Sequence, residues 1–432
     1  MNAVTYVKKF VAVVLVLLLI PIAIFVYQML HDPGSGQQQV RGFNADEQIV
    51  RGAYLARAGN CMACHTARGG TEFAGGRPIA TPFGSIYTSN LTPDRETGLG
   101  KWTYSDFWRA MHNGKSKDGN FLYPAFPYPS YTKVTRADSD ALYAYLKTLP
   151  PVRQAKRENE LRFPYNQRSL LAFWRTLYFT PGEFQPSAGQ SAEWNRGAYL
   201  VQGLGHCAAC HTGRNALGGT SPDNDLAGGL IPMLNWYATS LTSDSGAGLG
   251  DRHQADIAQL LKTGVSGRDA VFGPMAEVVR QSLQHLSEPD INAMAVYLKS
   301  IPKSTAASAP VAVKVGGEGE AIIKLGANLY EQHCVACHSA DGKGEASAYP
   351  TLAGARSLTG QSAINPIRIV LNGGYPPSTG GNPRPYGMPP FGTFMSDAEV
   401  AAVVSYVRSS WGNQGALVSP VEVGRLRSVP DE

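Results

Sequence analysis

The chain has 432 residues, 43 % apolar and 16 % charged, which supplies several hydrophobic cores and excludes an ordinary disordered chain. At roughly 150 residues per domain, this length suggests about three domains. The net charge of +5 is evenly spread, and no Lys/Arg-dense tract carries interleaved aromatic residues, so no nucleic-acid partner is expected. The spacing of the six cysteines is more informative than their number, because it is regular.

The N-terminal segment has the pattern of a membrane anchor. Lys8 and Lys9 precede an apolar run over residues 10–27, which Met29 and Leu30 extend. About 20 apolar residues span a bilayer as a helix, whereas the core of a signal peptide has about 7–15, and no small-residue cleavage site follows this run. We expect residues 1–35 to remain as an anchor in the inner membrane, with the rest of the chain in the periplasm. The alternative is a long signal peptide that is removed after export.

All six cysteines belong to three C-x-x-C-H motifs. Two thiols at this spacing attach to the two vinyl groups of a haem, and the histidine that follows binds the iron, so each motif predicts one covalently bound haem c. A thioredoxin-like redox pair does not need that histidine, a structural zinc site needs a second pair much closer in the chain, and disulfides would use the same thiols. The predicted attachment and iron-binding residues are Cys61, Cys64 and His65; Cys207, Cys210 and His211; and Cys334, Cys337 and His338.

The motifs lie in repeated segments. The string RGAYL precedes the first motif at 51–55 and the second at 196–200, and a looser GANLY precedes the third at 326–330. Each repeat ends in a segment with the apolar spacing of an amphipathic helix, at 138–149, 287–301 and 396–409. Ser287 and Ser396 are predicted N-caps, with Asp290 and Glu399 three residues later in the first turn.

These repeats predict an all-α fold of three cytochrome c-type domains in tandem after an N-terminal transmembrane helix. Little strand pattern is visible. The connector is rich in Pro, Arg and aromatic residues, and small residues dominate the linker. The predicted organisation is an anchor at 1–35, domain 1 at 45–150, a connector at 151–189, domain 2 at 190–302, a linker at 303–318, domain 3 at 319–412 and a polar tail at 413–432.

The ligand opposite each proximal histidine sets the chemistry of the haem iron, because methionine raises its potential, a second histidine lowers it, and an open position permits ligand binding. Met275 follows Gly273 and Pro274, and Met388 precedes two prolines, so both are predicted sixth ligands in loops. The other methionines near these sites, Met233, Met294 and Met395, are weaker candidates; Met294 falls inside the closing helix and Met395 at the edge of one.

The first repeat departs from this pattern. Segments of repeats 1 and 2 align at a constant offset, which places Phe126 opposite Met275, and phenylalanine cannot bind iron. His112 is the predicted substitute; Met111, an open five-coordinate iron and a purely structural role for His112 at a helix end are the alternatives. The remaining histidines show no pattern and are expected to be structural or exposed: His31, His206, His253, His285 and His333.

Several longer strings resemble the membrane-anchored tri-haem cytochrome c subunits of bacterial periplasmic dehydrogenase complexes. They are TPFGSIYTSNLTPD at 81–94, LYPAFPY at 122–128, SAEWNRGAYL at 191–200 and MPPF at 388–391. Members serve dehydrogenases of alcohols, aldehydes, sugar acids or N-heterocycles. Phe126, together with the stretch at 159–166, is similar to the branch whose partner contains molybdenum and iron–sulfur centres.

The resemblance implies a subunit that takes electrons from a dehydrogenase catalytic subunit and passes them through three haems to membrane ubiquinone or a terminal oxidase. The chain shows no paired carboxylates, nucleophile–base motif or G-x-G-x-x-G motif, so we do not expect it to be an enzyme on its own. Two alternatives remain: a peroxidase-like haem enzyme that uses an open haem 1 with His112 and Arg109, and an oxidase-associated cytochrome without a dehydrogenase.

Overall fold

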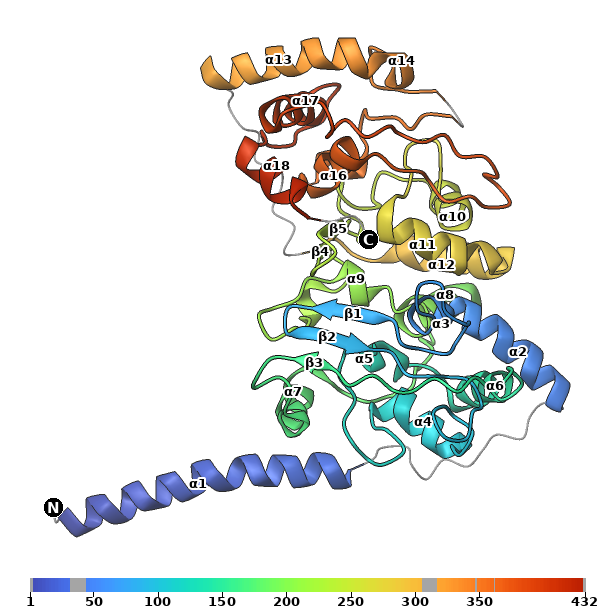
Figure 1. The fold of residues 1–432 in the computed structure, drawn as a ribbon, viewed down its shortest axis with the longest axis vertical. Helices are drawn as coiled ribbons and strands as arrows, with labels where there is room; N and C mark the ends of the chain where they lie inside the picture. The colour runs from blue at the N-terminus through green and yellow to red at the C-terminus, as the bar shows by residue number, and fades with distance from the viewer. Residues whose placement is uncertain (1–2, 32–43, 305–316, 346–347, 361, 430–432) are drawn as a thin grey trace. The chain divides into compact units, whose positions relative to one another are not determined.

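The computed structural model describes residues 3–31, 44–304, 317–345, 348–360 and 362–429 (Figure 1). The chain divides into two compact units. The first consists of residues 1–55, 64–185 and 216–219, and the second of residues 56–63, 186–215 and 220–432. Most of the predicted linker at 303–318 lies outside the described residues, as does part of the predicted anchor.

The first unit combines helices with a small antiparallel sheet. β1 and β2 form a hairpin, and β3, which lies in the predicted connector, pairs with β2 through Gly84 opposite Leu161. The connector also forms a helix, so it belongs to the folded unit. The elements are α1 (Ala3–Leu30), α2 (Ala45–Ala58), α3 (Cys61–Cys64), β1 (Pro78–Thr81), β2 (Gly84–Tyr87), α4 (Tyr104–Asn113), α5 (Tyr128–Tyr131), α6 (Arg136–Leu146), β3 (Glu160–Leu161), η1 (Arg168–Leu170) and α7 (Leu171–Tyr178), with α2 and α3 contributing residues to both units.

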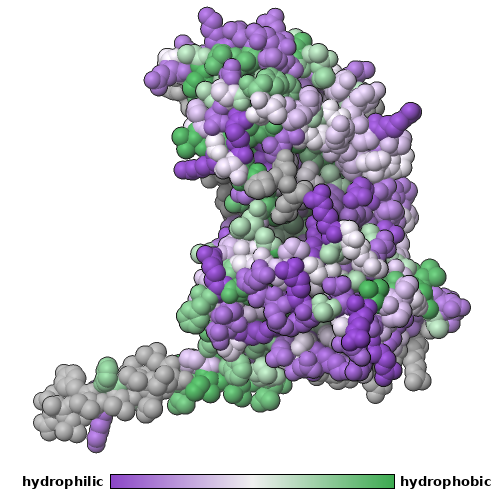
Figure 2. All heavy atoms as spheres, in the orientation of Figure 1, coloured by the Kyte–Doolittle hydropathy of each residue, from purple (hydrophilic) through white to green (hydrophobic). Residues whose placement is uncertain are grey.

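The N-terminal helix corrects the predicted membrane anchor. Within the part of the chain that the structure describes, no helix is both long and apolar enough to cross a membrane, which contradicts the anchor and the inner-membrane and periplasmic location that depended on it. The last turns of α1 instead pack against the first unit: Phe25 meets Phe121 edge to face at 6.3 Å, and Gln28 accepts a hydrogen bond of 3.2 Å from Arg175. Other hydrophobic side chains of these turns are exposed at the surface (Figure 2).

The second unit is also mainly helical. Its two strands form a hairpin in which Leu230 pairs with Tyr237. The described chain is helix-rich, as predicted, but the all-α class misses two short antiparallel sheets. The elements are α8 (Ala192–Gln202), α9 (Ala208–His211), η2 (Pro222–Asn224), β4 (Gly229–Ile231), β5 (Trp236–Ala238), α10 (Gln254–Thr263), α11 (Gly273–Gln281), η3 (Leu283–His285), α12 (Glu288–Ser300), α13 (Gly317–His333), α14 (Val335–His338), α15 (Arg356–Thr359), α16 (Ile364–Asn372), α17 (Asp397–Ser409) and α18 (Pro420–Arg427).

Each haem motif follows a helix that crosses the closing helix of its repeat in the same way. The pairs are α2 with α6, α8 with α12, and α13 with α17, and the last two pairs lie in the second unit. A glycine of the leading helix rests on a backbone carbonyl of the closing helix, and an added Cβ would overlap that carbonyl oxygen and the Cβ of a tyrosine four residues later. These contacts join Gly52 to Ala141 and Tyr145, Gly197 to Ala293 and Tyr297, and Gly326 to Ala402 and Tyr406.

The helix ends and the C-terminus show both a confirmed and a corrected prediction. Ser287 caps α12 by accepting from the Asp290 amide, and Ser396 forms a reciprocal capping box with Glu399 at the start of α17, as predicted. The C-terminal segment is more than a polar tail, because α18 packs against α17 and its Val423 is fully buried.

Candidate haem-attachment sites

The three C-x-x-C-H motifs adopt the same local structure. Each motif contains about one turn of helix, which carries or adjoins the two thiols and the imidazole. The turns are α3 (Cys61–Cys64) before His65, α9 (Ala208–His211) after Cys207, and α14 (Val335–His338) after Cys334. None of the six cysteines forms a disulfide. This donor set fits a haem c, which needs two thioether bonds and one axial nitrogen from a single short stretch of chain.

A backbone carbonyl orients each of the three proximal imidazoles. His65 Nδ1 lies 2.7 Å from the carbonyl oxygen of Ser89, and His211 Nδ1 lies 2.7 Å from that of Thr239. His338 Nδ1 lies 3.2 Å from the carbonyl oxygen of Pro350. A carbonyl oxygen can only accept, so Nδ1 carries the proton and Nε2 keeps its lone pair. This is the tautomer that binds a metal through Nε2.

Burial keeps these imidazoles neutral. Desolvation lowers the pKa of His65 and of His338, although the carbonyl hydrogen bond acts in the opposite direction. Burial is also the main cause for His211, whose pKa falls to about 4, with a raising contribution from Thr239 and a lowering one from the charge of Arg356. At neutral pH all three side chains are therefore in the form that can ligate iron.

The thiols of the second motif and Cys334 of the third lack the lowered pKa of a reactive redox pair. Burial raises the pKa of Cys207 to about 12 and that of Cys334 to about 11, and each is raised further by the second cysteine of its motif. Burial also raises the pKa of Cys210. A thioredoxin-like pair needs a lowered thiol pKa, so the electrostatics of Cys207, Cys210 and Cys334 disfavour that interpretation.

The two predicted methionine ligands come from different local structures. Met275 is in the first turn of α11 (Gly273–Gln281), where Gly273 has a φ of +55° and its backbone approaches the Trp236 ring. Met388 is held in a loop by two backbone hydrogen bonds with Gly374, of 2.8 and 3.0 Å. Both side chains are half-buried, on elements separate from the motif helices.

Two of the three rival methionines are packed in hydrophobic cores. Met294 is 2 % exposed in α12, and Met395 is 5 % exposed within the hydrophobic core of the third repeat. Met233 is half-exposed between β4 and β5, with a φ of +66°. The ranking of Met275 and Met388 above these residues as ligands stays a prediction.

His112 in the first repeat has the same orienting contact as the proximal histidines. It is buried in the last turn of α4, its Nδ1 lies 3.0 Å from the carbonyl oxygen of Thr132, and its ring stacks on Trp108 at 4.4 Å. Burial is the main cause that lowers its pKa, so a charged imidazolium that interacts with the helix dipole is disfavoured. Its neighbour Met111 is also buried, and Phe126 packs against Tyr131 at 5.2 Å.

Arg109 is engaged by the backbone. Its Nη2 donates to the carbonyl oxygens of Ser116 at 3.2 Å and Lys117 at 2.6 Å. These contacts hold the guanidinium on the loop that follows α4, whereas the peroxidase alternative needs it beside bound peroxide. The geometry of this arginine therefore does not favour that alternative.

The orienting carbonyls are functional groups that the sequence prediction missed. The signal was present, because the offset that aligns the first two repeats also places Ser89 opposite Thr239. Backbone acceptors have no side-chain signature, so only the repeat alignment could have marked them.

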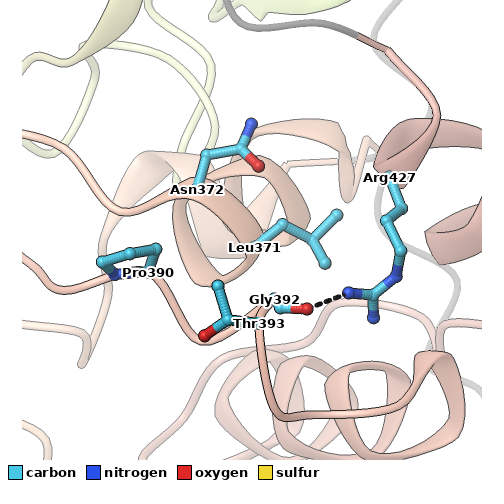
Figure 3. Close-up of a pocket in the computed structure, with 6 residues that line it drawn as sticks. All are labelled: Leu371, Asn372, Pro390, Gly392, Thr393 and Arg427. Carbon is cyan, nitrogen blue, oxygen red and sulfur yellow. Dashed lines mark hydrogen bonds between the residues drawn. The ribbon is translucent and has the colours of Figure 1, made fainter.

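A small cavity of about 280 Å³ lies in the third repeat (Figure 3). Arg427 reaches across it from α18 and donates from Nη1 to the carbonyl oxygen of Gly392. None of its lining residues is a predicted haem ligand. They are Leu371, Asn372, Pro390, Gly392, Thr393 and Arg427.

The fold and these sites define a protein with cytochrome c domains, and sequence comparisons agree. The cytochrome c family matches residues 49–150 and 323–411. The chain belongs to the family of cytochrome c subunits of dehydrogenase complexes, because relatives with that name align with it over nearly their whole length.

Three relatives illustrate the range of this family. The gluconate 2-dehydrogenase cytochrome c subunit of Pantoea cypripedii is 42 % identical over 88 % of this chain and 90 % of its own. The cytochrome c subunit of the quinone alcohol dehydrogenase of Gluconobacter oxydans (strain 621H) is 38 % identical over 89 % and 83 %. A nicotinate dehydrogenase subunit of Pseudomonas putida is 41 % identical over 83 % of this chain but only 30 % of its own.

Proposed function

We propose that this chain is a tri-haem electron-transfer subunit, with one covalently bound haem c at each C-x-x-C-H motif. The domains are those at 45–150, 190–302 and 319–412. The support is structural repetition: the same glycine-mediated helix crossing precedes each motif, and the same Nδ1–carbonyl contact orients each histidine. Met275 and Met388 are the proposed sixth ligands of haems 2 and 3, and His112 that of haem 1.

Its role is to accept electrons singly from a dehydrogenase catalytic subunit and to deliver them to ubiquinone or a terminal oxidase. The observation that carries this proposal is the alignment over nearly the full length with cytochrome c subunits of gluconate and alcohol dehydrogenases. Bound haem supplies one-electron chemistry, and the protein orients the imidazoles and shields them from water. The substrate, an aldehyde, alcohol, sugar acid or N-heterocycle, is bound by the catalytic partner.

The partner that we propose is a molybdenum and iron–sulfur dehydrogenase. Phe126 in place of methionine and the stretch at 159–166 support this branch. The nicotinate dehydrogenase relative also covers most of this chain.

Purification of the tagged full-length chain from its native host tests the proposal. We expect a catalytic subunit to co-elute, molybdenum to be present in the complex, and its substrate to reduce the haems. The mass of the mature chain should exceed that of the polypeptide by three haems. A chain that carries haem but elutes without a dehydrogenase, and whose haems no such complex reduces, would overturn the proposed role; a flavin or quinone cofactor in the partner would overturn only the molybdenum assignment.

A further inference from the structure

Within the second unit, the segment that follows the third motif docks onto the segment that follows the second. Asn365 of α16 receives a hydrogen bond of 2.9 Å from the Tyr237 amide and returns one of 2.8 Å to its carbonyl oxygen. The Arg368 guanidinium lies 5.0 Å from the centre of the Trp236 ring. Residues that belong to different repeats in the sequence therefore share one interface.

A buried charge cluster lies in the same interface. Asp269 from the second repeat accepts from Arg252 Nε at 2.6 Å and forms an ion pair of 3.5 Å with Arg356 Nε of the third repeat. Arg252 also donates to the carbonyl oxygen of Gly354 at 2.8 Å. The three charged side chains are at most 10 % exposed. Two guanidiniums and one carboxylate leave a net positive charge in a region of low dielectric.

Asp269 and Arg356 of this cluster are both ionised. Burial raises the pKa of Asp269, but Arg356 and Arg252 outweigh it, so the pKa is lowered overall. Burial lowers the pKa of Arg356 from a value so high that the guanidinium remains charged.

Arg356 of this cluster reaches the backbone that orients His211. Its Nη1 donates to the carbonyl oxygen of Ser240 at 3.4 Å, and the preceding residue, Thr239, accepts from His211 Nδ1 at 2.7 Å. The guanidinium and the imidazole therefore bind neighbouring carbonyls of one short backbone segment. The positive charge of Arg356 is therefore fixed one residue away from the carbonyl that orients the imidazole.

We propose that Arg356 is a positioning residue of the third repeat that raises the reduction potential of the haem at the second motif, and that Asp269 opposes this effect. A fixed positive charge near the proximal ligand disfavours the oxidised, more positive haem, so it stabilises the reduced state. This inference rests on the proposed attachment of haem at Cys207 and Cys210. It means that the docked third repeat sets the potential of its neighbour's haem.

A redox titration of the haem-loaded full-length protein tests the proposal. The double variant Cys207→Ala/Cys210→Ala identifies the component that belongs to haem 2, because that component should be lost. Arg356→Gln should lower the reduction potential of this component by up to about 59 mV. This shift corresponds to a tenfold change in the equilibrium constant of the one-electron reduction. Arg356→Lys should restore most of the potential, and Asp269→Asn should shift it in the opposite direction. The other two components should not move.

Arg368→Gln is the matched control, because it removes another buried arginine of the same interface, whose guanidinium lies against the Trp236 ring. It should lower the haem 2 potential clearly less than Arg356→Gln does. Shifts of the same sign in Arg356→Gln and Asp269→Asn, an equal shift in Arg368→Gln, or no shift at all would overturn the inference and indicate a packing role. Retention of all haem in the double cysteine variant would instead overturn the proposed attachment at the second motif.

Discussion

Arg196 and Asp290 are joined by two parallel hydrogen bonds, each of 2.8 Å, which tie the helix before the second motif to the first turn of the closing helix. Arg51 and Asp138 make the equivalent contact in the first repeat, at 2.6 Å. In the third repeat Leu325 occupies the arginine position and Glu399 is used in a capping box instead. In the first two repeats, the ion pair therefore supports a helix crossing that the packing of glycine makes possible. The third repeat has the glycine packing and the capping box but not the ion pair.

Removal of this ion pair should destabilise the second unit. Asp290→Asn leaves the half-buried Arg196 with a weaker partner, so we expect the free energy of unfolding to fall by about 1–3 kcal/mol. Urea denaturation followed by circular dichroism measures this loss. Arg153→Ala is the control, since its pair with Glu96 is mostly exposed and should contribute less than about 1 kcal/mol. Equal losses in both variants would contradict the structural role given to Arg196 and Asp290.

The glycine crossings predict a sharp difference between two Gly→Ala substitutions. In Gly197→Ala the new methyl group would overlap the carbonyl oxygen of Ala293, so the helices must separate, at a cost of about 1–3 kcal/mol or more. Gly189→Ala meets no atom within 4 Å and should be neutral or slightly stabilising. Thermal unfolding of the two variants checks this. A Gly197→Ala protein as stable as the parent would show that α8 and α12 do not cross as described.

The ligand of haem 1 can be identified by substitution of His112. If His112 is the ligand, haem 1 should have the lowest of the three potentials, because two imidazoles favour the oxidised iron more than an imidazole and a methionine do. His112→Ala should then change the lowest-potential component of a redox titration and allow carbon monoxide to bind one ferrous haem. Met111→Leu keeps the packing of α4 and should change neither. An unaltered lowest-potential component in His112→Ala would rule out this ligation.

Met275 and Met294 should respond differently to substitution. Met275→Ala should abolish the sulfur-to-iron absorption of one haem and lower one of the three potentials, with a modest effect on stability. Met294→Ala should leave the haem spectrum intact but cost about 2–5 kcal/mol, because its side chain is buried in α12. Visible spectroscopy and denaturation distinguish the two. Loss of the absorption in Met294→Ala instead would reverse the assignment.

Acid should destabilise the protein through three half-buried histidines. The pKa of His211 is about 4 in the folded chain, below its ordinary value of 6.5, and burial shifts His65 and His338 in the same direction. The unfolded chain therefore binds these protons first as the pH falls. The stabilisation should be complete above about pH 6.5 and should decrease as the pH falls toward 4.

Urea denaturation of the haem-loaded protein across this pH range measures the effect. Because iron and protons compete for the same imidazoles, bound iron also keeps protons off the folded chain, and the expected loss of stability in acid has the same direction. His253→Gln, an exposed position, should leave the pH profile unchanged. A free energy of unfolding that stays constant between pH 7 and pH 4 would refute the expectation.

The sequence predicted features whose cause is local. The caps Ser287 and Ser396 follow from residues three positions apart, and the core role of Met294 follows from its position on a closing helix. Arg356 could not be found in this way, because it meets Asp269 and the 239–240 backbone only through the docking of one repeat on another. The strands were missed because each has at most four residues, too short for a clear alternation.

The packing of α18 limits how far the chain can be shortened. Val423 is fully buried and Leu426 nearly so, both in the core that contains Val404 of α17. Arg427 also holds the loop after Met388 through the carbonyl oxygens of Gly392 and Met395. A chain that ended at residue 411, where the cytochrome c family match ends, would expose this core to water. Such a truncation would promote aggregation and proteolysis. An affinity tag placed after the last residue would instead leave α18 in position.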